Sequence, residues 1–167
     1  MEQLQCRALK QSDRAKANAF LTERWGSVVM MVRTQRVDMS QLPGILVEKQ
    51  GEIVALLTYR MQQKRCEIIS LDSLLQGQGI ATRLIESLLN LAGQAGCERV
   101  SVVTTNDNLN ALRFYQKRGF LLSALYPGSV DCARRQKPQI PTVGEYGIPL
   151  HTEIELERSI TSATEQP

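Results

Sequence analysis

The sequence predicts a single mixed α/β domain, and three features of the chain support this prediction. Two β-rich apolar runs, at 53–59 and 66–71, are joined by a short polar segment, which is typical of paired strands. After Leu75 the apolar spacing changes from the period of a strand to that of a helix. A strand, a helix and another strand then follow between residues 100 and 126. This alternation is typical of α/β folds.

The first half of the chain is rich in predicted strands and contains one predicted helix. Ser12 or Asp13 is expected to cap this helix, which should end at Trp25-Gly26. Gln50-Gly51-Glu52 has the composition of a hairpin turn between two strands. The strands of this half are expected at 4–9, 28–32, 44–48, 53–59 and 66–71.

The helix predicted after Leu75 has the most regular pattern in the chain. Its apolar residues recur at i, i+4 and i+8, so they share one helix face. The members of this face are Ile80, Ala81, Leu84, Ile85, Leu88, Leu89 and Ala92. Gly93 and Gly96 are expected to end the helix.

A second strand–helix pair is expected after this helix. The strand covers 100–104, and Asn106 or Asp107 should cap a helix that reaches Arg118. Gly119 should stop this helix, because glycine readily adopts the left-handed conformation that ends helices.

The last third of the sequence is less regular. Three prolines and two glycines at 138–149 predict a long loop. At 150–157 apolar and polar residues alternate, which predicts a half-buried strand with His151 and the three glutamates on its wet face. The domain is therefore expected to cover residues 1–157, with 158–167 as a flexible tail.

Composition narrows the class of protein. The 167 residues are 43% hydrophobic and 22% charged, and the net charge of +3 is too small to indicate nucleic-acid binding. The longest apolar runs have five residues, so we expect no membrane span. Four scattered cysteines and one histidine argue against a metal site. These features predict a cytoplasmic protein.

The segment Gln76-Gly77-Gln78-Gly79-Ile80-Ala81 carries the chemical information. It lies between a predicted strand and a predicted helix, where backbone N–H groups and the helix dipole favour an anion. A P-loop is excluded, because no Lys-Ser or Lys-Thr follows the glycines. A dinucleotide fingerprint is excluded too, since Thr82 takes its sixth position and Glu98 precedes the next strand. When this segment is considered alone, a simple strand-to-helix turn that binds no ligand stays open as the alternative.

Two motifs resemble those of a known family. Gln76-x-x-Gly79-x-Ala81 matches the Q/R-x-x-G-x-G/A signature of the GNAT superfamily of N-acetyltransferases. Asn108-x-x-Ala111-x-x-x-Tyr115, followed by Gly119-Phe120, resembles the second motif of that family. The order of strands and helices from about Leu4 to Tyr126 agrees as well.

The resemblance implies a fold and a cofactor. The expected fold is a GNAT-like, largely antiparallel twisted sheet, flanked by helices on both faces and splayed between its fourth and fifth strands. The expected cosubstrate is acetyl-CoA, with no metal, and the pyrophosphate would lie on the loop backbone. A backbone N–H near Leu74 would stabilise the thioester oxygen. The cofactor-binding residues implied are Leu71, Asp72, Ser73, Leu74, Gln76, Gly77, Gln78, Gly79, Ile80, Ala81, Thr82, Asn108 and Tyr115.

The resemblance also implies catalytic residues. Tyr115 would donate a proton to the departing sulfur, since a phenol stays protonated at neutral pH. Core packing is the alternative role for Tyr115. Glu67 is the candidate general base and Asp72 lies nearer the cofactor end, although either carboxylate can instead be solvated or ion-paired. A chain of waters can also replace a single base.

The implied function is transfer of an acetyl group to a primary amine, by direct attack in a ternary complex. The amine belongs to a small molecule or to a peptide. A non-catalytic CoA-binding or sensor module, and an enzyme for another acyl-CoA, stay open as alternatives. Trp25 and the stretch 129–149 would border the acceptor, although Trp25 can instead be a packing anchor. Arg134, Arg135 and Lys137 could attract an acidic acceptor or the 3′-phosphate of coenzyme A, and a solvated helix face is their alternative role. A homodimer also stays open.

Overall fold

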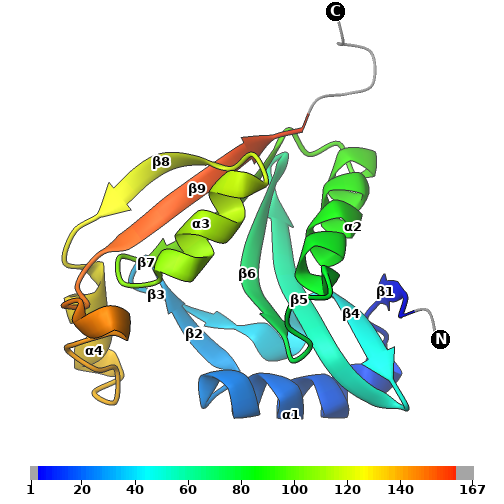
Figure 1. The fold of residues 1–167 in the computed structure, drawn as a ribbon, viewed down its shortest axis with the longest axis horizontal. Helices are drawn as coiled ribbons and strands as arrows, with labels where there is room; N and C mark the ends of the chain where they lie inside the picture. The colour runs from blue at the N-terminus through cyan, green and yellow to red at the C-terminus, as the bar shows by residue number, and fades with distance from the viewer. Residues whose placement is uncertain (1–3, 161–167) are drawn as a thin grey trace, which may run out of the picture. The chain divides into compact units, whose positions relative to one another are not determined.

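A computed structural model describes residues 4–160 as a mixed α/β fold, which confirms the predicted class (Figure 1). The chain divides into two compact units. Unit 1 comprises residues up to Met30, Asp38–Val100 and the chain from Ser159, and unit 2 comprises Met31–Val37 and Ser101–Arg158. Most of the predicted tail, at 161–167, lies outside the described residues.

Four strands of unit 1 pair in the order β1-β4-β5-β6, and every neighbour is antiparallel. The bounds are Cys6–Ala8 for β1, Gly44–Lys49 for β4, Glu52–Gln62 for β5 and Arg65–Ser73 for β6. Tight turns join β4 to β5 and β5 to β6. Gln50 and Gly51 in the first turn have positive φ, as do Gln63 and Lys64 in the second. Two consecutive residues with positive φ are typical of hairpin turns. The hairpin predicted at Gln50-Gly51 is confirmed.

Two helices of unit 1 pack on these strands. α1 (Arg14–Trp25) buries Ala17, Phe20 and Leu21 and contacts β5, and α2 (Ile80–Gln94) contacts β4, β5 and β6 (Figure 1). The predicted apolar face of α2 is buried at Ile80, Leu84, Ile85, Leu88 and Ala92. Gly93 does not end the helix as expected. The helix continues through Gln94, and the chain leaves it at Gly96, whose φ is 82°.

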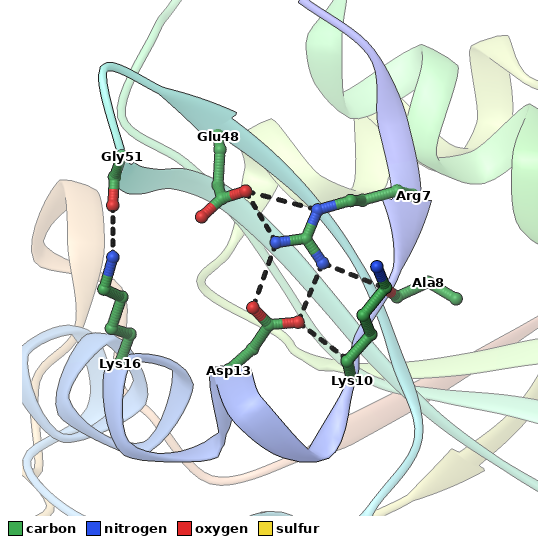
Figure 2. Close-up of polar contacts among 7 residues, drawn as sticks. All are labelled: Arg7, Ala8, Lys10, Asp13, Lys16, Glu48 and Gly51. Carbon is green, nitrogen blue, oxygen red and sulfur yellow. Dashed lines mark hydrogen bonds and ion pairs between the residues drawn. The ribbon is translucent and has the colours of Figure 1, made fainter.

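An arginine and two carboxylates join β1, β4 and the start of α1 (Figure 2). The Arg7 guanidinium donates to Asp13 Oδ2 at 2.7 Å and to Glu48 Oε2 at 2.6 Å, and the backbone N–H of Lys10 also donates to Asp13. Asp13 precedes α1, as predicted, but its side chain makes no hydrogen bond to the helix N-terminus. It stabilises instead the short 3-10 turn η1 (Gln11–Asp13) that leads into the helix.

This cluster should make the stability of the protein depend on pH in acid. Hydrogen bonds from Arg7 and Lys10 lower the pKa of Asp13 from 3.8 to about 2. The carboxylate therefore stabilises the fold fully above its unfolded pKa, and that contribution is lost as the pH falls from about 4 through about 2. Asp13→Asn should lower the free energy of unfolding at pH 7, and the difference from wild type should shrink toward pH 2. Urea unfolding at several pH values measures this; a constant difference would contradict it.

Unit 2 contains the remaining strands and helices. Its strand order is β7-β9-β8, with β8 and β9 antiparallel. The bounds are Arg99–Thr105 for β7, Leu109–Lys117 for α3, Leu121–Tyr126 for β8, Ser129–Gln136 for α4 and Glu153–Ser159 for β9. The predicted splay involves β6 and β7, which belong to different units, so it stays a prediction.

One strand, β3, and one α-helix, α4, were not predicted. β3 (Gln35–Asp38) forms a small sheet with β2 (Val29–Val32), which was predicted. Only Val37 of β3 is buried, so that strand has too few apolar residues to show a period. α4 has eight residues, with only Ser129, Val130 and Ala133 buried. Short polar elements such as these depend on tertiary contacts rather than on sequence period.

The predicted cap of α3 is wrong by one or two residues. Asn108 is the N-cap, and its Oδ1 accepts the Ala111 N–H at 3.0 Å. Asn106 and Asp107 have other partners: Asn106 donates to the Pro149 carbonyl, and Asp107 accepts from the Glu145 N–H. Asparagine and aspartate both suit an N-cap, so contacts distant in sequence decided which of the three residues caps the helix.

The predicted wet face of the last strand is also partly wrong. The carboxylate of Glu153 is buried, and it accepts the Arg33 backbone N–H at 3.1 Å. The Glu155 carboxylate is paired with the Arg33 guanidinium at 3.1 Å. The turn between β2 and β3, which contains Arg33, therefore covers this face of β9. The alternation of apolar and polar residues alone could not indicate this contact.

Candidate functional site

The loop between β6 and α2 has the backbone conformation that its glycines predict. Gly77 and Gly79 adopt φ values of 72° and 70°, in the left-handed region that glycine enters without steric cost. A Cβ built at either position would meet no atom within 4 Å, so the space beside the loop is open. The glycines thus serve a tight turn and leave the backbone accessible to a ligand.

The N-terminus of α2 is suited to an anion. Gly79 is its N-cap, the first intrahelical bond runs from the Arg83 N–H to the Gly79 carbonyl, and no side chain caps the helix. The N–H groups of the first turn have no partner within the helix, and the dipole makes this end positive. The first turn contains no acidic residue. These features fit a phosphate group against Gly79, Ile80 and Ala81.

The end of β6 bears on which backbone N–H near Leu74 could face a thioester. The N–H of Leu74 itself donates to the Val54 carbonyl at 2.8 Å. Pairing with β5 therefore continues one residue beyond the strand. Because N–H directions alternate along an antiparallel strand, the N–H of Ser73 points away from β5. Ser73 Oγ lies 3.3 Å from the Leu75 N–H, which supports the turn that follows.

The candidate base Glu67 lies in β6 and is buried. Its Oε2 accepts from Arg60 Nε at 2.9 Å, and Arg60 lies opposite it on β5. The ion-paired alternative for Glu67 is therefore present in the structure.

Asp72 has a different environment, near the end of the same strand. Its side chain is 11% exposed, and Trp25 Nε1 donates to its Oδ2 at 2.7 Å. Arg24 Nε lies 3.6 Å from Oδ1. Burial raises the pKa of Asp72, and the contacts with Trp25 and Arg24 oppose this only in part. The contact joins residues 47 positions apart, so no pattern in the sequence could have shown it.

The other two predicted site residues belong to unit 2. Asn108 caps α3 through its Oδ1, as described above. Tyr115 is buried in the same helix, and its ring packs edge-on against Phe114 and Phe120, with centroids 5.1 Å and 5.4 Å away. Tyr115 thus has the core-packing role that was left open, and this role does not exclude chemistry at its hydroxyl.

The long loop predicted at 138–149 is present and well anchored within unit 2. It contains the 3-10 turn η3 (Glu145–Gly147). The Arg134 guanidinium donates to the carbonyls of Ile140, Pro141 and Leu150, so this arginine holds the loop in place. Gly144 lies against Asp107, where a Cβ would approach the carboxylate oxygen to 2.0 Å. The loop therefore has a fixed conformation in unit 2.

Neither a membrane helix nor a metal cluster is found in the described part of the chain. Between residues 4 and 160, no helix is long and apolar enough to span a bilayer. The same residues contain no group of three or more His, Cys, Asp or Glu side chains arranged to hold a metal ion.

Comparison with known proteins identifies the family. The sequence model of the acetyltransferase (GNAT) family matches residues 11–120, a range that includes the glycine loop, Asn108 and Tyr115. The chain belongs to the GNAT family. This match confirms the family resemblance that the two sequence motifs indicated.

One relative by sequence and two solved structures illustrate what this chain is similar to. YdhI of Bacillus subtilis is 43% identical over 136 residues, which cover 81% of this chain and 85% of YdhI. An IAA acetyltransferase from Bacillus cereus has the same fold, with a TM-score of 0.70 at 20% identity over 94% of this chain and 99% of that one. A GNAT acetyltransferase from Elizabethkingia anophelis, solved with acetyl-CoA bound, has a TM-score of 0.67 at 15% identity, covering 95% of this chain and 99% of that one.

Proposed function

We propose that this GNAT protein transfers an acetyl group from acetyl-CoA to a primary amine. The observation that carries the proposal is the open, uncapped N-terminus of α2, entered through two left-handed glycines directly after β6. That geometry fits a pyrophosphate. The acetyl-CoA bound to the Elizabethkingia relative supports the choice of cosubstrate.

Residues 71–82 would bind most of the cosubstrate. The backbone of Gln76–Ala81 would hold the pyrophosphate, with the Thr82 hydroxyl as a further contact. The end of β6 would lie along the pantetheine arm. Because Leu74 is bonded to Val54, we assign to Ser73 the N–H that stabilises negative charge on the thioester oxygen. Asn108 would contact the pantetheine through its side-chain amide.

The reaction forms one bond and breaks another. The amine nitrogen bonds to the acetyl carbon, the carbon–sulfur bond breaks, and the electron pair leaves on sulfur. Tyr115 would donate a proton to that sulfur, and Glu67, Asp72 or a water would accept the proton lost by the amine. A lysine-like amine has an ordinary pKa of about 10.4 and is mostly protonated at neutral pH, so a proton acceptor is needed.

Two measurements, thiol release and calorimetry, separate this proposal from its two alternatives. Free thiol release is followed with acetyl-, propionyl- or succinyl-CoA and a panel of primary amines. Release with acetyl-CoA that depends on the amine supports the proposal. Preference for another acyl-CoA indicates a different acyltransferase. Binding of acetyl-CoA in calorimetry without thiol release from any pair indicates a non-catalytic CoA-binding module. Light scattering of the full chain tests whether the protein forms a homodimer.

Asn108 allows its two roles to be separated. Asn108→Ala removes the cap of α3 and should cost about 1 kcal/mol of stability, as well as weakening acetyl-CoA binding. Asn108→Asp keeps an oxygen for the Ala111 N–H but loses the amide donor. We therefore expect near wild-type stability with weaker acetyl-CoA binding for Asn108→Asp, measured by urea unfolding and calorimetry. Wild-type affinity in both variants would restrict Asn108 to capping.

A further inference from the structure

We infer that Trp25 and Asp72 form the site that binds the ammonium group of the acceptor. The inference deepens the proposed function and rests on it, because it assigns the acceptor side of the same reaction. It commits to a class of acceptor: a primary alkylammonium, in preference to an acidic or uncharged compound. The two residues come from the end of α1 and the end of β6, both in unit 1.

The Asp72 side chain is only 11% exposed, and its carboxylate has few close hydrogen-bond donors. A carboxylate offers about four lone-pair positions, and Asp72 uses one in a short bond from Trp25 Nε1 at 2.7 Å. Its other oxygen has only Arg24 Nε, at 3.6 Å, beyond the length of a good hydrogen bond. Burial raises the pKa of this carboxyl because desolvation penalises its charged form, and the contacts with Trp25 and Arg24 oppose this only in part. A donor with positive charge would supply what is missing.

The Trp25 side chain adds a second feature that favours a cation. Its ring N–H is held by Asp72, yet the residue is 45% exposed, so part of the indole faces solvent beside the carboxylate. An indole face attracts organic cations through its quadrupole. Trp25 is also the last residue of α1, where the helix dipole is negative and favours positive charge.

Arg24 is the cation that lies beside the Asp72 carboxylate in the structure, and its contact with Oδ1 is long. Its side chain is 41% exposed, and its Nε lies 3.6 Å from Asp72 Oδ1, which is longer than a good hydrogen bond. An incoming ammonium group can replace it, because an ammonium has three compact donors for the free positions of the carboxylate. Arg24 therefore competes with the acceptor, and its removal should improve acceptor binding.

The position of the pair in β6 links it to the proposed chemistry. Asp72 directly precedes Ser73, whose N–H is assigned to the thioester oxygen in the proposed function. An ammonium bound at the Asp72 side chain would thus lie one strand residue from that position. The pair would select the acceptor and hold its nitrogen at the end of β6.

The binding experiment uses the only tryptophan in the chain as a reporter. Pentylamine is titrated into full-length protein saturated with CoA, and the emission of Trp25 is followed; 1-pentanol serves as the uncharged probe and pentanoate as the acidic one. We expect a saturable change with pentylamine alone. Asp72→Asn should weaken that response about tenfold or more, as expected for loss of a charge-assisted bond. Glu98→Gln, at an exposed carboxylate of the same unit, should leave it unchanged.

The kinetic experiment gives a second, independent readout. Asp72→Asn should raise KM for the amine about tenfold or more, while the Kd for acetyl-CoA stays the same because the strand backbone is unaltered. Arg24→Gln should lower the KM for the amine. An equal response to pentanol, or an unchanged amine KM in Asp72→Asn, would overturn the inference. Failure of wild-type protein to bind acetyl-CoA would overturn the proposed function instead, and the fluorescence titration repeated without CoA would still test the ammonium site.

Discussion

Replacing Gly79 with aspartate should abolish measurable binding of acetyl-CoA. Gly79 caps α2 with a φ of 70°, and the space around its Cβ position is empty, so a carboxylate there would occupy the proposed pyrophosphate site. It would place negative charge against a negative ligand and would itself take up the N–H groups of the first helical turn. Isothermal calorimetry with acetyl-CoA measures the loss.

Two control variants separate charge from backbone strain. Gly79→Asn has nearly the same size and tolerates positive φ about as well as aspartate, but it is neutral. It should therefore weaken binding less than Gly79→Asp. Gly96→Asp adds the same side chain at another open glycine with positive φ, at the far end of α2, and should bind acetyl-CoA normally. Wild-type affinity in Gly79→Asp would remove the loop from the cofactor site.

Removing the hydroxyl of Tyr115 should reduce turnover by about 100-fold, the lower end of the effect of a general acid. Tyr115→Phe keeps the ring, which packs on Phe114 and Phe120, so folding and acetyl-CoA affinity should change little. Thiol release under saturating substrates, together with the Kd for acetyl-CoA, measures the two effects separately.

The packing role of Tyr115 requires its own control. Tyr115→Ala removes a buried ring and should cost about 3–5 kcal/mol of stability, by analogy with other large-to-small core changes. Comparison of the two variants shows whether lost activity follows the hydroxyl or the fold. Undiminished kcat in Tyr115→Phe, with the best acceptor found, would make Tyr115 a core residue only.

Much of the architecture could be predicted from local patterns. The apolar residues of α2 recur with the helical period of 3.6 residues. The hairpin turn depends on two adjacent residues, Gln50 and Gly51, which both adopt positive φ. β3 and α4 were not predicted, because each has few buried residues and therefore no clear apolar period in its sequence. Patterns that arise within one element can be seen in the sequence; those that depend on another element cannot.

The candidate site shows the same division. The glycine loop and the Asn108–Tyr115 spacing are local, so the sequence alone determined the family and the proposed cosubstrate. Only the tertiary structure decided which backbone N–H groups and carboxylates of the candidate site already have partners within their own unit. Leu74 donates its N–H to β5, Glu67 pairs with Arg60, and Asp72 meets Trp25 from a strand 47 residues away. The physical reason is that hydrogen bonding and burial depend on neighbours in space, and these neighbours are chosen by the packing of α1, β5 and β6.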